Sequence, residues 1–163
     1  MPDTIPGMLA AAAERDPDGD WLRTDDDQLT FAAAAALVAR AATRLLDAGV
    51  ARGDRIVLTA RTTPSYLLAW LAVCSTGAVA VPTNPAGKPT ELAGLLSQVR
   101  PRLVLSDPEL KSLVHQAAQQ LPSDPAVLDV DEVVGDWRQP LDAADWPLRL
   151  EVSATDLAVL IPT

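Results

Sequence analysis

Short runs of aliphatic residues alternate with longer stretches of helical periodicity along most of this chain. The pattern predicts strands at 55–59, 78–81, 103–105 and 126–128, and helices at 31–48, 64–76, 90–99 and 108–121. Alternation of this kind is typical of βα units, in which a helix connects each strand to a parallel neighbour. The strand runs are apolar at successive positions, as is required when helices cover both faces of a sheet. The predicted fold class is therefore α/β, with a mainly parallel sheet and helices on both faces.

The first thirty residues depart from this alternation. A helix is expected at 5–14, where apolar residues share one face before a turn rich in Asp, Pro and Gly. A short hairpin is expected next, with two strands flanking the acidic turn 25–27. Together with the alternating units, these elements form a predicted core over residues 5–128.

The end of the chain is also different. Residues 129–155 are acidic and lack clear periodicity, so we expect a loop with short helical pieces. Trp137 and Trp146 in this loop are expected to anchor it to the body, with contact to a partner as the alternative. Residues 156–163 begin with an apolar run, which predicts a last strand at 156–161.

Composition excludes several classes of function. The 163 residues allow one domain or a large piece of one. The net charge of -9, from 22 acidic and 13 basic side chains, argues against binding nucleic acid or an anionic membrane surface. The longest apolar block, 66–81, is interrupted and is shorter than the about 20 residues needed to span a bilayer. A single cysteine and the lack of a basic leader favour a cytoplasmic protein without disulfides.

No complete catalytic or metal-binding constellation is visible in the residues. The run Gly87-Lys88-Pro89-Thr90 lacks the spacing of a P-loop. His115 lies on the polar face of its helix and is expected to be a surface residue, whereas Cys74 lies on an apolar face and is expected to be a buried thiol. The acidic residues 25–27 lack the alternating ligands of a calcium loop. We therefore predict no catalytic residue and no metal ligand in this chain.

The expected last strand suggests that the fold is incomplete. A parallel strand normally leads into a helix that covers the sheet, but only Pro162 and Thr163 follow residue 161. An uncovered apolar strand invites pairing with another segment. The expected partner is either the remainder of the same polypeptide or a second copy of the chain.

A series of blocks, in order and spacing, resembles the adenylate-forming superfamily of AMP-dependent synthetases and ligases. One block is Gly-Ala-Val-Ala-Val-Pro at 77–82, followed by Asn84-Pro85. The other blocks that carry the resemblance are 29–31, 46–50, 52–56, 69–73, 91–92, 101–107 and 156–163. The resemblance identifies the chain as the first part of the large N-terminal domain of an acyl-CoA synthetase-like fold. The matching region ends at Thr163, which corresponds to the first residue of the family's phosphate loop, Thr-Ser-Gly-Thr-Thr-Gly-x-Pro-Lys-Gly.

The resemblance implies a function for the intact protein. Members use ATP and Mg²⁺ to activate a small carboxylic acid as an acyl-adenylate, and usually transfer the acyl group to CoA. Thr163 would open the phosphate loop. A basic residue that contacts CoA phosphates follows Asn-Pro in some members; here that position is Ala86, and Lys88 is the nearest cation. The 163-residue chain alone is expected to be inactive, because most of the ATP site would lie beyond it.

Three alternatives remain open at this level. The intact protein could be an acyl-AMP ligase or a carrier-protein adenylation domain instead of a CoA ligase. The chain could also be a catalytically incomplete domain that serves in binding or assembly. An unrelated nucleotide-binding or response-type α/β domain ranks last, since it would need a phosphate loop or an acidic pocket at the strand ends.

Overall fold

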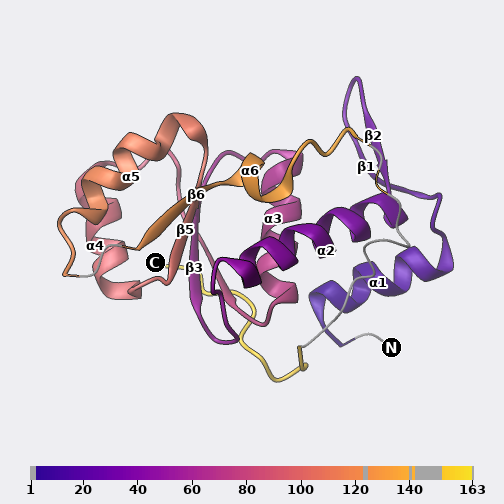
Figure 1. Ribbon diagram of the computed structural model, residues 1–163, viewed down its shortest axis with the longest axis horizontal. Coiled ribbons are helices and arrows are strands. Elements are labelled where there is room, and N and C mark those ends of the chain that lie inside the picture. The colour runs from indigo at the N-terminus through magenta and orange to yellow at the C-terminus, as the bar shows by residue number, and fades with distance from the viewer. Residues whose placement is uncertain (1–2, 123–124, 140, 142–151, 163) are drawn as a thin grey trace.

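A four-stranded parallel sheet forms the centre of the molecule (Figure 1). The computed structural model describes residues 3–122, 125–139, 141 and 152–162. The strands are β3 (Arg55–Thr59), β4 (Val79–Pro82), β5 (Leu103–Ser106) and β6 (Ala126–Asp129), in the spatial order β4-β3-β5-β6. All three pairings are parallel, which confirms the predicted α/β class.

Helices cover both faces of the sheet (Figure 1). One face carries α1 (Ile5–Arg15), α2 (Phe31–Asp47), α3 (Pro64–Ser75) and α6 (Val130–Val134); the other carries α4 (Pro89–Val99) and α5 (Lys111–Ala118), which follows the 3-10 turn η1 (Pro108–Leu110). Successive side chains of β3 point to opposite faces of the sheet. Ile56 and Leu58 pack against the helices on the first face, and Val57 packs against those on the second. Among the described residues, none of the helices combines the length and apolar character needed to cross a membrane.

Local capping chemistry fixes where the main helices begin and end. The hydroxyl of Thr30 accepts a hydrogen bond from the Ala33 N–H, and that of Thr63 accepts one from the Tyr66 N–H. These side chains satisfy N–H groups that a helix start leaves without partners. After α2, Gly49 adopts φ +82°, a left-handed conformation that glycine reaches without steric cost. Thr30, Thr63 and Gly49 therefore cap these helices, and each is a residue type that favours its position.

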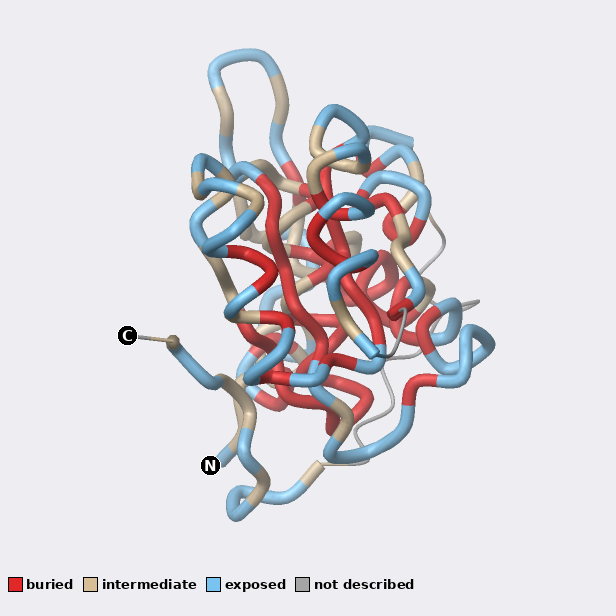
Figure 2. Tube along the Cα trace, turned by 90° about the vertical axis from the view of Figure 1, so that its left-hand side faces the viewer, coloured by how far each residue is buried: buried red, intermediate tan, exposed pale blue. Residues whose placement is uncertain are grey.

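The predicted hairpin consists of β1 (Asp20–Arg23) and β2 (Gln28–Thr30), which pair antiparallel. Its turn is closed by hydrogen bonds between Thr24 and Asp27 in both directions. Figure 2 shows that the tip of this hairpin is exposed, whereas the buried residues gather on the sheet and the central helices. The turn thus projects from the body and carries its aspartates to the surface.

The start of the acidic segment packs into the core. Val130, Val133 and Val134 of α6 are buried against α2 and α3, and Trp137 is only 6% exposed. The guanidinium of Arg138 lies 4.4 Å from the centre of the Trp137 ring. Trp137 therefore anchors this segment to the body, as predicted. Trp146 lies outside the described residues.

The strand predicted at 156–161 is not formed as a regular strand. A single parallel bridge joins Val159 to Ala80 of β4, with 2.9 Å hydrogen bonds from Ala80 N–H to Ala158 C=O and from Leu160 N–H to Ala80 C=O. The next outward-facing residue of β4 is Pro82, which has no N–H to extend the ladder. Leu157 and Ile161 are 59% and 74% exposed, so the expectation of a buried strand is wrong for this segment.

Candidate functional site

The chain reverses its direction across the sheet at β3. From β3, helix α3 leads to β4 on one side, and helix α4 then crosses the opposite face to β5 on the other side. The carboxyl ends of β3 and β5 therefore border a topological switch point. In open α/β sheets, ligands bind in the crevice outside the strands at such a point. We consider this edge of the sheet the candidate functional site.

An arginine and an aspartate join the two strands at this edge. The backbone N–H and the Nε of Arg61 donate to the same oxygen of Asp107, at 2.9 and 3.0 Å. Nη2 of Arg61 also lies 3.0 Å from Glu109. Asp107 is only 7% exposed, and its hydrogen bond raises the pKa of Arg61, with Glu109 adding to the effect. The pair holds the loops after β3 and β5 together.

A cleft of about 200 Å³ lies beside this pair. Its walls come from Arg61, Asp107, the 3-10 turn and the loop after β4, including Pro85 and Ala86. The loop after β4 is held in place by the Asn84 side chain, which accepts a 2.9 Å hydrogen bond from the Ala86 N–H. The cleft thus brings the Asn-Pro block of the sequence next to the switch point.

Lys88 and Thr163 are the two residues that the sequence singled out. Lys88 is exposed at the start of α4, where its backbone N–H donates to the Glu91 carboxylate at 3.1 Å. The residues that line the cleft include Ala86 and Arg61 but not Lys88. Thr163 lies outside the described residues. The structure therefore brings Ala86, and not Lys88, to the wall of the cleft.

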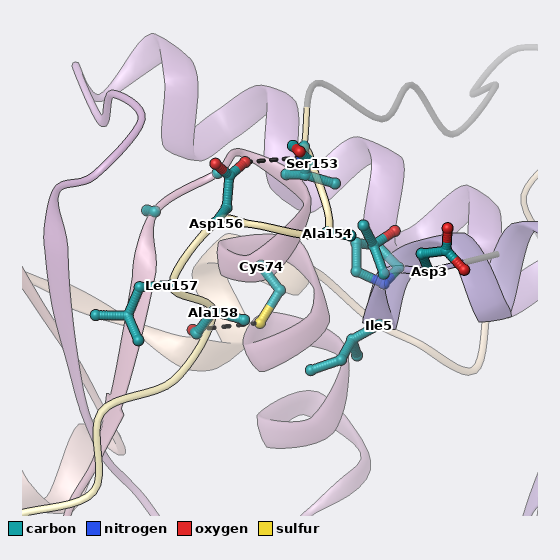
Figure 3. A pocket seen from close by; sticks show the side chains of 13 residues that line it. Asp3, Ile5, Cys74, Ser153, Ala154, Asp156, Leu157 and Ala158 are labelled. Atoms are coloured by element: carbon teal, nitrogen blue, oxygen red, sulfur yellow. Dashed lines mark hydrogen bonds between the residues drawn. The ribbon is translucent and has the colours of Figure 1, made fainter.

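A second pocket lies beneath the segment that leads toward Thr163 (Figure 3). Its volume is about 120 Å³, and it is lined by the start of α1, the end of α3 and the segment 152–158. Burial raises the pKa of the Cys74 thiol to about 12, and its sulfur lies 3.9 Å from the Ala158 carbonyl oxygen. Cys74 is therefore a buried, protonated thiol, as the sequence predicted.

Asp156 holds the segment over this pocket (Figure 3). Its carboxylate accepts a 2.8 Å hydrogen bond from the Ser153 N–H and pairs with Arg52. The first of these contacts, together with the Arg52 pair, lowers the pKa of Asp156. The segment that precedes the expected phosphate loop is thus pinned to the end of α3 and to the turn before β3.

The His, Cys, Asp and Glu side chains are the remaining candidates for metal ligands. Within the described ranges, no set of three or more His, Cys, Asp and Glu side chains is arranged to hold a metal ion. His115 is exposed on α5, in agreement with its assignment to the surface.

Sequence reasoning missed Arg61 and Asp107. Each residue follows the end of a buried parallel strand, Arg61 two positions after β3 and Asp107 directly after β5. Charged residues at such positions meet at the carboxyl edge of the sheet, so this signal was present in the sequence. The pairing of Arg61 with Asp107 could not be read from the sequence, because 46 residues separate them. Only the adjacency of β3 and β5 brings them together.

Known proteins resemble this chain in sequence and in fold. The oxalate–CoA ligase of Arabidopsis thaliana is 35% identical over 121 residues, 73% of this chain and 24% of that protein. Protein Y of Streptomyces griseus is 28% identical and matches 98% of this chain and 56% of its own length. The chain thus spans about a quarter to a half of these relatives.

Solved structures extend the comparison to the fold. The fatty acyl CoA synthetase of Mycobacterium tuberculosis has a TM-score of 0.84 at 24% identity, over 99% of this chain and 32% of that one. VinN has a TM-score of 0.77 at 28% identity, over 96% of this chain and 41% of that one. The fold is therefore that of the first part of much longer proteins. A family model described as AMP-binding enzyme matches residues 9–163, and the chain belongs to this adenylate-forming family.

Proposed function

We propose that this chain is the first part of the AMP-binding domain of an ATP-dependent carboxylic acid:CoA ligase. The observation that carries the proposal is the similarity to two proteins named as CoA ligases over nearly three quarters of the chain. The oxalate–CoA ligase of Arabidopsis thaliana is 35% identical, and a probable CoA ligase of Humulus lupulus is 34% identical over 119 residues. The segment from Asn84-Pro85 to Leu92 looks most like the corresponding segment of CoA ligases, and its Pro85 lines the cleft beside the switch point.

The proposed reaction has two steps. The carboxylate of the acid attacks the α-phosphorus of ATP and pyrophosphate leaves; the thiol of CoA then attacks the acyl carbon and AMP leaves. Electrostatic stabilisation of the phosphates is the main demand on the protein in the first step. Thr163 would provide the first hydroxyl and N–H of the phosphate loop, and Lys88 would contact a phosphate of CoA. The Arg61–Asp107 pair would keep the adjoining edge of the sheet rigid.

A carrier-protein adenylation domain is the second candidate. The phosphinothricin tripeptide synthetase PhsB of Streptomyces viridochromogenes is 32% identical over 105 residues, 64% of this chain. Such a protein would share the adenylation step and differ in the thiol that accepts the acyl group. An acyl-AMP ligase would stop after the first step.

The test is to assay the intact protein with ATP, Mg²⁺ and a panel of carboxylic acids. Pyrophosphate release measures the first step, and acyl-CoA detected by mass spectrometry measures the second. We expect both with at least one acid, and no pyrophosphate release from the 163-residue chain alone. Pyrophosphate release without acyl-CoA would favour the acyl-AMP ligase or the carrier-protein reading. Robust adenylation by the isolated chain would contradict the proposal that most of the ATP site lies outside it.

Two variants test the proposed roles of Lys88 and Thr163 separately. Lys88→Ala should raise the KM for CoA about two- to fivefold, because an exposed charge contact is worth a fraction of a kcal/mol to about 1 kcal/mol. It should leave CoA-independent pyrophosphate release unchanged. Thr163→Val should instead slow pyrophosphate release and leave the KM for CoA unchanged. An unaltered KM for CoA in Lys88→Ala would remove Lys88 from the site.

A further inference from the structure

A groove of about 430 Å³ lies where α4 and α5 end. The two helices pack side by side (Figure 1), and the groove lies between the end of α4 and the chain that follows α5. Helix α4 starts after the carboxyl end of β4 and ends before the amino end of β5. The groove is therefore at the edge of the sheet opposite the candidate site, and we call it the amino-edge groove. It is lined by Leu96, Ser97, Arg100, Leu121 and Pro122.

The walls of the amino-edge groove combine apolar surface with positive charge. Leu96 is fully buried, Leu121 is half-buried and Pro122 is exposed. Arg100 is exposed at the same groove, and no acidic residue is among the described residues that line it. Apolar side chains beside an arginine are typical of surfaces that bind other proteins, where arginine is enriched.

Two further arginines extend the positive charge along this edge of the sheet. Nη2 of Arg55 donates to the carbonyl oxygen of Arg100 at 3.4 Å, and the N–H of Arg102 donates to that of Arg55 at 2.9 Å. All three side chains are exposed, and none forms an ion pair with the part of the chain that the structure describes. Because the chain has 22 acidic and 13 basic side chains, a shortage of carboxylates does not explain this.

The backbone of Arg100 is an independent sign that its side chain has a role. Arg100 is the C-cap of α4 with φ +50°, and among the described residues it is the one non-glycine residue at positive φ. This conformation is unfavourable for a residue with a Cβ, and glycine is the usual choice at a helix end. The chain uses Gly49, Gly77 and Gly135 in this way after α2, α3 and α6. An arginine in a strained position indicates a contact that its side chain makes with a partner.

The arrangement of the charges selects the kind of partner. Arg55 and Arg102 belong to neighbouring strands, which lie about 4.8 Å apart, and Arg100 adds a third position at the end of α4. An extended peptide can place several carboxylates along such a row. The polar residues of the groove wall, Ser97 and Arg100, are exposed, so a small inorganic anion would find no enclosed site. Nucleic acid is disfavoured by the net charge of -9.

We propose that the amino-edge groove docks a short acidic segment of a partner protein. An apolar side chain of that segment contacts Leu121 and Pro122, and its carboxylates pair with Arg100, Arg55 and Arg102. Such a surface gives specificity through complementary charge, and the apolar contact excludes water from the centre. The inference does not depend on the proposed ligase activity, because the groove and the candidate site lie at opposite edges of the sheet.

Isothermal titration of the intact protein with the peptide acetyl-Glu-Asp-Leu-Leu-Asp-Glu-amide tests the surface. We expect saturable binding of one peptide per chain that weakens as NaCl is added. The double variant Arg55→Gln/Arg100→Gly should weaken binding about tenfold, since each exposed pair contributes a factor of about two to five. The matched double variant Arg15→Gln/Arg23→Gln, which removes two exposed charges elsewhere, should change the affinity less than about twofold.

The single variant Arg100→Gly separates binding from stability. It should weaken peptide binding about two- to fivefold. Its thermal midpoint of unfolding should equal or exceed that of the wild type, because glycine adopts the left-handed conformation without steric cost. A lower midpoint would show that Arg100 serves the fold, and it would overturn the role assigned to its side chain.

Control ligands identify what the groove recognises. The peptides acetyl-Gln-Asn-Leu-Leu-Asn-Gln-amide and acetyl-Glu-Asp-Ser-Ser-Asp-Glu-amide should both bind more weakly, the first without carboxylates and the second without the apolar anchor. The proposal fails if no binding saturates, if the two double variants lose affinity equally, or if either control peptide binds as well as the first. Tighter binding of hexathymidylate would assign the groove to nucleic acid. Self-association in sedimentation that Arg100→Gly abolishes would assign it to a second copy of the chain, and both results would overturn the proposal.

Discussion

At the scale of single residues, two arginines on α2 complete the end of a helix that lies far away in the sequence. Nη1 of Arg44 donates to the carbonyl oxygens of Glu132 and Val133, at 2.9 and 3.0 Å, and Arg40 donates to that of Val134. The last carbonyls of a helix have no partner within it, and α6 is only five residues long. Burial, and then the neighbouring Arg44, lowers the pKa of Arg40.

Replacement of Arg44 by methionine should therefore destabilise the protein. Arg44→Met keeps an unbranched side chain and removes both hydrogen bonds to α6. We expect the free energy of unfolding to fall by about 1–3 kcal/mol, the usual range for hydrogen bonds from a charged donor. Urea unfolding followed by circular dichroism measures it. The control Arg15→Met, at the exposed end of α1, should change the free energy by less than about 0.5 kcal/mol. Equal effects in both variants would show that Arg44 contributes only a surface charge.

Cys74 gives a second prediction at this scale. Because burial raises its pKa to about 12, the reactive thiolate is scarce in the folded protein at neutral pH. Modification by a thiolate-directed disulfide reagent should be slow in buffer and fast in denaturing urea. The rate in buffer should rise with pH toward 12. Rapid modification of the folded protein at pH 7 would contradict the buried position described here.

At the scale of elements, the final segment behaves unlike the strands of the sheet. It is attached to β4 by one bridge, at Ala80 and Val159, and to the turn before β3 by the Arg52–Asp156 pair. Leu157 and Ile161 remain exposed. Its docking therefore depends on a few polar contacts and on Ala158, which is partly buried against the core.

This dependence predicts a loss of docking in acid. The hydrogen bond from the Ser153 N–H, and then the contact with Arg52, lowers the pKa of Asp156 below its ordinary value of 3.8. A carboxyl whose folded pKa is lowered stabilises the docked state above its ordinary pKa, and that stabilisation is lost as the pH falls through the lowered value. The amide resonance of Leu160, which donates to Ala80, should shift in NMR spectra below pH 3.8.

Asp156→Asn should remove that acid transition, and the control Asp47→Asn should retain it. If the Leu160 resonance followed the same pH course in wild type and Asp156→Asn, another group would control the segment. The comparison is informative because both variants remove one carboxylate, and only that of Asp156 contacts the final segment.

At the scale of the whole molecule, the sheet divides two unequal cores. The larger lies against α1, α2, α3 and α6, and the smaller against α4 and α5.

The chain carries a net charge of -9, so like charges repel across a small structure. Addition of NaCl from low ionic strength should screen this repulsion and raise the thermal midpoint of unfolding. A differential scanning measurement in which the midpoint falls with NaCl would show that attractive pairs outweigh the repulsion.

The sequence by itself determined the helices, the four strands and the caps at Thr30, Thr63 and Gly49. These features depend on hydrophobic periodicity and on contacts between residues a few positions apart, and both can be read from the sequence. It also determined the family, because several blocks keep a fixed order and spacing. The buried Cys74 and the exposed His115 could be assigned for the same reason, from the face of one helix.

Only the tertiary structure decided the strand order β4-β3-β5-β6, the Arg61–Asp107 pair and the contacts of Arg44 with α6. It also reduced the predicted last strand to one bridge, since Pro82, the next residue of β4 on that side, has no N–H to extend the ladder. Propensity and periodicity describe a residue's near neighbours along the chain. Partners 46 or 89 residues apart are chosen by which layers pack together, and that choice depends on the free energy of the whole core.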